Sequence, residues 1–405
     1  MEELIVKDEI SWNQKVKVKG VIEWDNNNKL FHRIASGRKA NKLINKLENL
    51  NGEVLQTEEE IVKEILNFFE ALYKGEDNQK VGIEGLDWAA ICRESKEFLE
   101  QPFSEEEVKV ALFQCDGDKA PEPDGFSMAA LQDGWEVIKG DIMKVFREFF
   151  DDGVVNAKTN ATFICLIPKK LNSISIRDFR PISLVTSLYK VLAKVLSLRL
   201  KRVLSETIDS SQGAFVQGRQ ILDLVLIANE VVEEYRSKKK EGIVFKIDFE
   251  KAYDHISWEF LEFVMERKGF GDRWRKWISG CLSSANFSVI INGKSSGRFG
   301  ASRGLRQGDP LSPFLFILVA DVLSRLMKRA CECNLIEGFE IGRNKLEISH
   351  LQFADDSIFF VPNRDCFVEN LVGILKVFSL ASGLKINMGK SIVLGLNIEP
   401  KGYLT

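Results

Sequence analysis

The sequence predicts an α+β protein whose C-terminal part is an antiparallel sheet packed by helices. Apolar runs of strand length alternate with segments of helical periodicity from Gly242 onward. Their order is strand, helix, helix, strand, strand, helix, strand once one additional hairpin is set aside. This becomes the ferredoxin-like order if the second helix packs on the same face of the sheet. Two strands end in aspartates, which such a sheet would place beside each other.

Residues 1–75 are expected to form a charged connector with one helix, and residues 76–160 a helical N-terminal extension. The connector helix is predicted from Glu58 to Tyr73, because apolar residues recur there at helical spacing. These residues are Ile61, Ile65, Phe68, Phe69 and Leu72. The extension has helical periodicity from 104 to 150, with an interruption at the proline- and glycine-containing segment 120–126.

The remaining elements are predicted in two groups, one in residues 161–241 and one in residues 242–396. The first group has a strand at 161–167 and helices at about 187–204 and 222–235. The second group contains a strand at 242–248, a helix at 257–268, a hairpin turning at Asn292-Gly293, a helix at about 310–331, a hairpin around Asp355-Asp356, a helix at 366–381 ended by Gly383, and a strand at 384–395.

The aspartates that end two apolar strands are the main chemical signal. Asp248 follows the strand 242–248, and the pair Asp355-Asp356 separates two apolar runs. An unpaired carboxylate in apolar surroundings is unfavourable, and a hard cation such as Mg²⁺ would offset this. An Asp-rich turn is the alternative for a single pair. A third polar segment, 304–313, lies between the two acidic sites, and three such segments together favour a functional site.

These segments resemble the reverse transcriptases of non-LTR (LINE-type) retrotransposons, most closely those of plants. The matching motifs are Leu166 to Lys170, Asp178 to Leu184, Gln212 to Val216, Gly218 to Gln220, Asp248 with Tyr253, Gln307-Gly308, Phe353 to Asp356, Gly383 to Asn387 and Lys390-Ser391. The resemblance runs from about Trp12 to the end of the chain. It implies polymerase fingers at about 161–241 and a palm at about 242–396, within a reverse transcriptase region 161–405.

The resemblance also implies the roles of individual residues in nucleotidyl transfer from a dNTP to a primer 3′-OH. Asp248 and Asp355 would bind two Mg²⁺ or Mn²⁺ ions, with Asp356 as a weaker ligand. The remaining nucleotide-binding residues would be Lys169 and Arg180 at the triphosphate, the Phe249 carbonyl, Tyr253 at the sugar, Gln307 and Gly308 beside the nucleotide, and Lys390 as proton donor to pyrophosphate. The alternatives are a packing role for Tyr253, a surface-loop position for Gln307 and an exposed strand end for Lys390.

Composition adds limits on partners and location. The net charge of −3 and the pI of about 5.9 are not those of a global nucleic-acid binder. A cationic stretch from Lys169 to Arg202 is therefore expected to contact phosphates, although a solvated helix face is the commoner outcome. No Cys-x-x-Cys occurs, so zinc is not expected. No signal peptide is evident, and the most apolar run, Phe314 to Ala320, stops at Asp321, so no membrane partner is expected.

The expected partners are an RNA template with a DNA primer and dNTPs, and the expected location is intracellular, with the nucleus favoured over the cytoplasm by the resemblance. The family's endonuclease, primer grip, thumb and C-terminal Cys/His segment have no counterpart in this sequence, which suggests a fragment or decayed copy. A catalytically inactive remnant with weak RNA binding is therefore the main alternative. An RNA-dependent RNA polymerase or an intron maturase is a third alternative. Ala354 and Tyr253 argue against the RNA polymerase, and the lack of a counterpart to the maturase C-terminal domain argues against the maturase.

Overall fold

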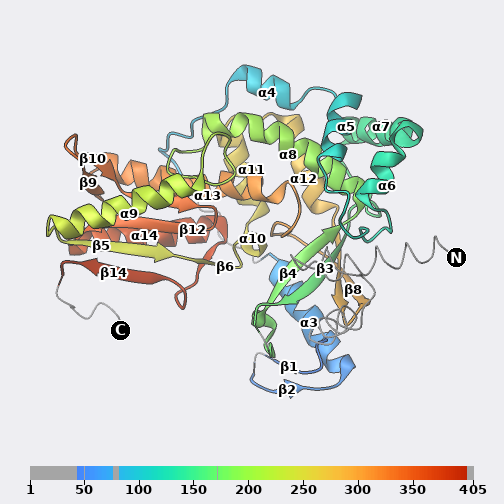
Figure 1. Cartoon of the computed structure of the whole chain (residues 1–405), viewed down its shortest axis with the longest axis horizontal. Coiled ribbons are helices and arrows are strands. Elements are labelled where there is room, and N and C mark those ends of the chain that lie inside the picture. The colour runs from blue at the N-terminus through green and yellow to red at the C-terminus, as the bar shows by residue number, and fades with distance from the viewer. Residues whose placement is uncertain (1–42, 50, 76–81, 171, 399–405) are drawn as a thin grey trace, which may run out of the picture.

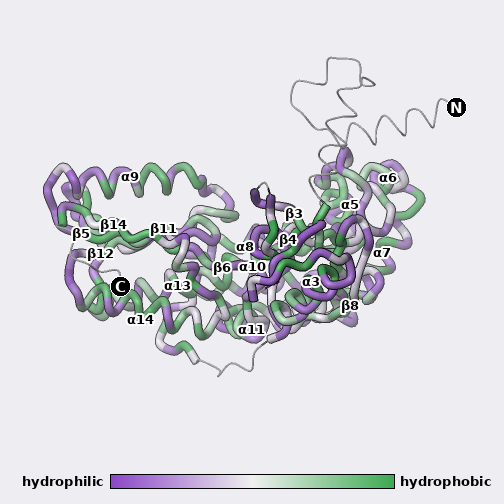
Figure 2. The backbone as a smooth tube through the Cα atoms, turned by 90° about the horizontal axis from the view of Figure 1, so that it is seen from below, coloured by the Kyte–Doolittle hydropathy of each residue, from purple (hydrophilic) through white to green (hydrophobic). Residues whose placement is uncertain are grey.

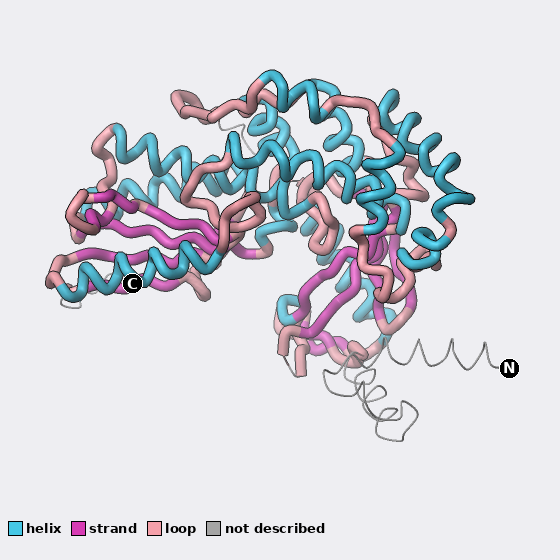
Figure 3. Tube along the Cα trace, turned by 45° about the horizontal axis from the view of Figure 1, so that its top comes forward, coloured by secondary structure: helices cyan, strands magenta, loops and turns pink. Residues whose placement is uncertain are grey.

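The computed structural model describes residues 43–49, 51–75, 82–170 and 172–398. Helices and antiparallel strands are mixed along this part of the chain, and the predicted α+β class is confirmed. Figure 3 shows the strands in two groups, which correspond to two four-stranded sheets. The first 42 residues of the predicted connector, with most of its cations, lie outside the described residues.

The first sheet has the predicted ferredoxin-like order. Its strands are β5 (Gly242–Ile247), β11 (His350–Phe353), β12 (Asp356–Pro362) and β14 (Ile392–Leu396). They lie in the order β11-β12-β5-β14, and every neighbouring pair is antiparallel. The first strand along the chain is therefore central, beside the hairpin that carries the aspartate pair (Figure 1).

Alternating side chains of this sheet face two helical layers, as the period of a strand requires. Phe245 and Phe359 pack with α11 (Trp258–Arg267), α13 (Ser312–Glu332) and α14 (Asp365–Ser382). Val244 and Phe360 face the opposite side and pack with α9 (Ile221–Ser237). Figure 2 shows α9 on one side of the sheet and α13 with α14 on the other. The helix predicted at 222–235 among the fingers thus covers the palm sheet.

The second sheet joins strands that are distant in sequence. Its strands are β4 (Phe179–Val185), β3 (Ala161–Pro168), β7 (Asn286–Ile291) and β8 (Lys294–Gly300), in that order. The β7–β8 hairpin turns at Asn292 and Gly293, whose φ values of 52° and 86° fit the predicted type I′ turn. β7 pairs in parallel with β3, a contact that the local hairpin pattern could not reveal.

Helices surround both sheets. The predicted helix Glu58–Tyr73 is α3, and it packs against the second sheet beside the short pair β1 (Leu47–Glu48) and β2 (Val54–Leu55). The other helices of the main core are α4 (Arg93–Leu99), α5 (Glu105–Phe113), α6 (Met128–Asp133), α7 (Trp135–Asp152), α8 (Ser187–Thr207) and α12 (Asp272–Ser283). Among the described residues, no helix combines the length and apolar composition needed to cross a membrane.

The single strand predicted at 384–395 is wrong, because a turn divides it. β13 (Lys385–Ile386) pairs with β6 (Phe249–Glu250), whereas β14 pairs with β5. Between them, the Asn387 carbonyl accepts hydrogen bonds from the amides of Lys390 and Ser391. The Asn387 amide donates to the Asp248 carbonyl at 2.8 Å. The turn therefore places Lys390 beside Asp248. A short pair that was not predicted, β9 (Phe339–Ile341) with β10 (Leu346–Ile348), precedes β11.

Candidate active site

The two acidic segments meet at one end of the first sheet. Ser357 of β12 pairs with Ile247 of β5, so the next position of this antiparallel pair sets Asp356 opposite Asp248. Asp355 lies in the β11–β12 turn, where Ala354 has a φ of 58°. We call Asp248, Asp355 and Asp356 the strand-end carboxylates. The structure brings together the three residues that the sequence had placed at strand ends.

The strand-end carboxylates repel one another and attract two lysines. Asp355 is exposed, but nearby protein atoms displace enough water to raise the pKa of its carboxyl. The charges of Asp356 and Asp248 raise this pKa further, and Lys390 opposes them. Lys390 Nζ lies 3.7 Å from Asp248 Oδ2, and Lys246 Nζ lies 3.4 Å from Asp356 Oδ1. The site is a negative centre with exposed lysine counter-ions.

The donor chemistry suits a hard divalent cation that also takes ligands from a substrate. Carboxylate oxygens are preferred by Mg²⁺, which is commonly held by one or two carboxylates together with phosphate oxygens. Among the described residues, no group of three or more His, Cys, Asp or Glu side chains is arranged to hold a metal ion by itself. The strand-end carboxylates nevertheless supply, on neighbouring strand ends, hard oxygen donors of the kind that such a cation takes.

Tyr253 lies beside these carboxylates. It belongs to the short helix α10 (Ala252–His255), and its ring stacks on Phe316 of α13 with centroids 5.0 Å apart. Partial burial raises the pKa of Tyr253 to about 12, and the charge of Asp355 contributes. The phenol is therefore neutral at physiological pH and close to Asp355. Phe249, by contrast, is buried against Phe378, and only its backbone in β6 is available to a ligand.

The loop with Gln307 and Gly308 is fixed to the second sheet. The Ser183 amide of β4 donates to the Gln307 carbonyl at 2.8 Å. Gly308 has a φ of 109°, and a Cβ there would lie 3.1 Å from the Ser183 carbonyl oxygen. A side chain at position 308 would therefore strain this contact. The loop is held between the two sheets, with Gln307 half-buried.

Arg306 precedes Gln307 in the polar segment 304–313, but its side chain does not face the candidate site. Its guanidinium is buried, 3.0 Å from Asp309 Oδ2 and 3.1 Å from the Cys281 carbonyl oxygen. It also lies over the ring of Tyr189. The sequence feature that could have indicated this burial is Asp309, three residues later, which forms the internal ion pair with Arg306.

Only part of the cationic stretch 169–202 faces the site. Burial and the charges of Lys390 and Arg180 lower the pKa of Lys169, so these cations share one region near the strand-end carboxylates. Arg180 is exposed on β4 opposite Ile167. Arg199 is instead buried and forms a bidentate pair with Glu107, at 2.6 and 2.7 Å. The expected phosphate contact is therefore wrong for Arg199.

Gln212 belongs to a motif with no assigned role, and the structure gives it one. Its side chain is fully buried, and Oε1 accepts hydrogen bonds from the amides of Ala354 at 3.1 Å and Ala214 at 2.9 Å. The neighbouring Gly213 amide donates to the Gln352 carbonyl at 3.0 Å. Gln212 thus supports the turn that presents Asp355. Its position in the sequence motif was the available signal.

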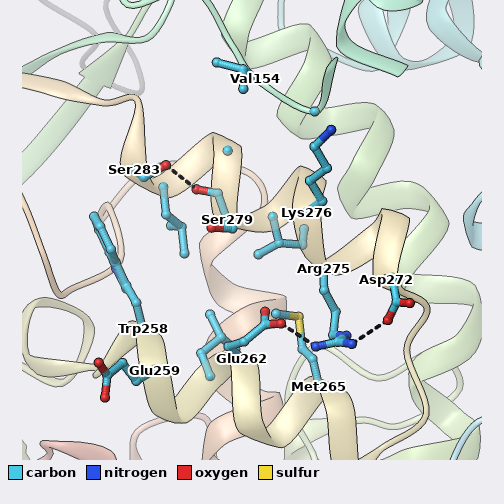
Figure 4. Close-up of a pocket in the computed structure, with 15 residues that line it drawn as sticks. Val154, Trp258, Glu259, Glu262, Met265, Asp272, Arg275, Lys276, Ser279 and Ser283 are labelled. Atoms are coloured by element: carbon cyan, nitrogen blue, oxygen red, sulfur yellow. Dashed lines mark hydrogen bonds and ion pairs between the residues drawn. The ribbon is translucent and has the colours of Figure 1, made fainter. Parts of the chain in front are cut away.

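A cavity of about 680 Å³ lies away from these residues, between α11, α12 and the turn after α7 (Figure 4). Its lining includes Trp258 and Met265, and Arg275 reaches Glu262 and Asp272 across its edge at 2.5 Å each. None of the predicted site residues lines it. The cavity is separate from the candidate active site.

Comparisons with known proteins place the chain in one family. Residues 167–399 match the family described as "Reverse transcriptase (RNA-dependent DNA polymerase)". The chain is 27% identical over 372 residues to "Transposon TX1 uncharacterized 149 kDa protein" of Xenopus laevis, covering 91% of this chain and 28% of that protein. It is 28% identical over 290 residues to "Retrovirus-related Pol polyprotein from type-2 retrotransposable element R2DM" of Drosophila melanogaster, covering 71% and 26% respectively.

A solved structure of apo telomerase from Candida tropicalis, truncated from its C-terminal domain, is also similar. It has a TM-score of 0.44 and 13% identity, and the match covers 69% of this chain and 58% of that one. The chain spans only about a quarter of the length of the two curated relatives, 28% and 26%.

Proposed function

Since the chain belongs to the reverse transcriptase family, we propose that it is an RNA-directed DNA polymerase of a non-LTR retrotransposon. It would transfer a nucleotidyl group from a dNTP to a primer 3′-OH on an RNA template. The observation that carries this proposal is the convergence of Asp248 and Asp355 at the end of the β5–β12 pair. The likeness to proteins of the TX1 and R2 elements supports a retrotransposon origin.

In this proposal, Asp248 and Asp355 are ligands of two Mg²⁺ or Mn²⁺ ions, and Asp356 is a weaker ligand. Bound divalent cations would stabilise the attacking primer oxygen and the pyrophosphate leaving group. By holding these cations, the carboxylates would orient the primer end and the triphosphate, and the Phe249 carbonyl would add one neutral oxygen. Lys390 and Lys246 must leave their ion pairs when the nucleotide binds, which their exposure permits.

The nucleotide would be held from three sides. Lys169 and Arg180 neutralise the triphosphate from the second sheet, Lys as a point charge and Arg bidentately. Tyr253 contacts the sugar and excludes a 2′-OH, while Gln307 and Gly308 support the base from the loop anchored on Ser183. Lys390, on the turn after β13, is the candidate proton donor to pyrophosphate.

A primer-extension assay tests the proposal. Purified protein with poly(rA)/oligo(dT), labelled dTTP and Mg²⁺ is expected to give extension that EDTA and Asp355→Asn each abolish. Lys169→Gln should raise the KM for dTTP. Lys170→Gln is the matched control, because Lys170 pairs with Asp178 at 2.9 Å instead of facing the site. Absence of extension by the unmodified protein, with RNA binding retained, would favour the inactive remnant.

A further inference from the structure

The C-terminal end of α3 is bound to the loop 302–305. The Leu72 carbonyl accepts from Arg303 Nε at 2.7 Å, and the Tyr73 carbonyl accepts from the Ser302 amide at 2.9 Å. The Gly75 amide donates to Ser302 Oγ at 2.6 Å. These bonds connect the end of a helix from the N-terminal connector to the loop that leads directly into Gln307.

The side chain of Tyr73 extends from the end of α3 to the loop 251–256, which includes the short helix α10 and Tyr253. Tyr73 is 1% exposed and stacks on Phe287 with centroids 5.1 Å apart. Its hydroxyl donates to Asp254 Oδ1 at 2.7 Å, inside the protein. Asp254 is itself 4% exposed, so no water competes for this bond. A hydrogen bond to a buried carboxylate is among the stronger ones in a protein.

The two loops are also joined to each other. The Leu305 amide donates to the Tyr253 carbonyl at 2.7 Å, and the Gly304 amide donates to the Ile256 carbonyl at 2.8 Å. Gly304 has a φ of 89°, and a Cβ there would lie 2.7 Å from the Asp254 carbonyl oxygen and 3.0 Å from the Tyr73 ring. The close packing of helix end and loops therefore requires glycine at position 304.

The beginning of the loop 251–256 is held by α3 as well. Lys251 has a φ of 43°, a conformation that costs energy for a residue with a side chain. Its ammonium group lies over the ring of Phe68, 3.9 Å from the centroid, and Phe68 belongs to α3. Tyr253 is thus bracketed by two residues, Lys251 and Asp254, that both contact the same helix.

We propose that α3 controls sugar discrimination through Tyr73, which acts as a positioning residue for Tyr253. This inference rests on the proposed polymerase function and on the proposed contact of Tyr253 with the sugar. α3 lies outside residues 167–399, the part that matches the family, so the control would come from the N-terminal connector. The chain of contacts is Tyr73 to Asp254, Asp254 to its neighbour Tyr253, and Tyr253 to the ring of Phe316.

Tyr73→Phe is the test, because it removes the hydroxyl and leaves the buried ring. Tyr235→Phe is the matched control: Tyr235 in α9 also uses its hydroxyl in one bond, from the Glu340 amide at 3.3 Å, but on the other side of the first sheet. Asp254→Asn keeps an acceptor for the Tyr73 hydroxyl and should behave like the unmodified protein. Asp254→Ala removes the acceptor and should behave like Tyr73→Phe.

Two readouts separate this inference from the proposed function. In primer extension, the preference for dTTP over UTP is expected to fall roughly threefold to tenfold in Tyr73→Phe and Asp254→Ala, because only part of the free energy of this hydrogen bond acts on Tyr253. The control and Asp254→Asn should keep the wild-type ratio. In hydrogen–deuterium exchange, amides of residues 251–256 and 302–305 should exchange faster in Tyr73→Phe and not in Tyr235→Phe.

The exchange measurement does not depend on catalysis. If the unmodified protein extends no primer, the proposed function fails, whereas faster exchange in Tyr73→Phe still supports the positioning contact. Unchanged exchange of both loops in Tyr73→Phe would overturn the inference, with or without polymerase activity. So would an unchanged dTTP-to-UTP preference in an active Tyr73→Phe protein, since it would leave Tyr73 as a packing residue only.

Discussion

Two groups of acidic residues differ in how the fold treats their charge. The strand-end carboxylates are three acids at one end of a sheet, and among the described residues two of them form ion pairs with the exposed lysines Lys246 and Lys390. The second group, which we call the buried ion cluster, consists of Lys268, Asp321, Arg325 and Asp209. Asp321 lies on α13, and its Oδ2 is 2.5 Å from Lys268 Nζ and 3.0 Å from Arg325 Nε. Its Oδ1 accepts from the Asp209 amide at 2.6 Å.

This difference distinguishes structural charges, which are neutralised inside the protein, from site charges, which remain available to a ligand. In the buried ion cluster every charge has a partner inside the protein, and nothing remains for a ligand to neutralise. At the strand ends, burial and the charges of Asp356 and Asp248 raise the pKa of Asp355, and an incoming cation would compensate the three like charges. Both groups contain aspartates within apolar sequence, so apolar surroundings alone do not identify a site.

The largest expected effect is on stability, from breaking the buried ion cluster. Asp321→Ala leaves Lys268 and Arg325 buried without their partner, and we expect a loss of about 3–5 kcal/mol in the free energy of unfolding. Asp248→Ala, at the strand ends, should change this free energy by less than about 0.5 kcal/mol. Urea titration followed by tryptophan fluorescence measures both. Equal losses in the two variants would remove the distinction between structural and site charges.

The next largest effect is on catalysis, and here the strand-end carboxylates, not the buried ion cluster, are the sensitive group. Asp355→Asn should reduce primer extension by about a hundredfold to a thousandfold or more, because it removes electrostatic stabilisation of the reacting groups. Its urea midpoint should stay at or above the wild-type value, since a repelling charge is lost. Near-normal extension by Asp355→Asn would show that the carboxylates are only an acidic turn.

Local patterns predicted many of the helices and strands, although they missed the division of the strand 384–395 and the pair β9–β10. The helix Glu58–Tyr73 was predicted with its observed bounds because its apolar residues recur at helical spacing, and the structure adds a Thr57 cap and three glutamates in its first turn. The palm order followed from strand and helix periodicities, and Asp248 and Asp355 were identifiable as acids that end apolar strands. These features depend on residues close together in sequence.

Partners far apart in sequence could not be predicted. The pairing of β7 with β3, the burial of Arg306 and Arg199, and the contact of Tyr73 with Asp254 across 181 positions depend on how elements pack. The sequence alone does not distinguish a cationic side chain that contacts a phosphate from one that pairs with an internal acid. Asp321 was visible only as the end of an apolar run, although it is the centre of the buried ion cluster.

The pH dependence of stability gives a third, smaller effect with opposite signs in two regions. Burial raises the pKa of Asp254 to about 6, although Tyr73, Lys251 and Lys169 oppose this. An acid with a raised folded pKa destabilises the fold as it ionises, so its contribution should fall by about 2–3 kcal/mol as pH rises from 4 to 6. Asp254→Asn should remove this decline relative to wild type.

Asp209 in the buried ion cluster should behave in the opposite way. Burial raises its pKa, but bonds from Lys328 and Ser211 outweigh this and lower the pKa to about 2. Its stabilisation is present above about pH 4 and is lost as pH falls toward 2. Urea titrations of Asp254→Asn and Asp209→Asn between pH 3 and 7 compare them. Slopes of the same sign would contradict the assigned environments.

The smallest expected effect is on substrate choice at Tyr253. Tyr253→Val removes the ring that stacks on Phe316 and lies near Asp355, and a smaller side chain leaves room for a 2′-OH. We expect the preference for dTTP over UTP to fall by about tenfold to a hundredfold, the usual range for a single shape contact in a pocket. Extension with dTTP should persist, because Asp248, Asp355 and Asp356 are unchanged.

Phe316→Leu serves as a control: it removes the stacking partner but keeps the tyrosine, so its change in preference should be smaller and in the same direction. An active Tyr253→Val protein with unchanged preference would place Tyr253 among the packing residues and would leave the strand-end carboxylates as the functional part of this region.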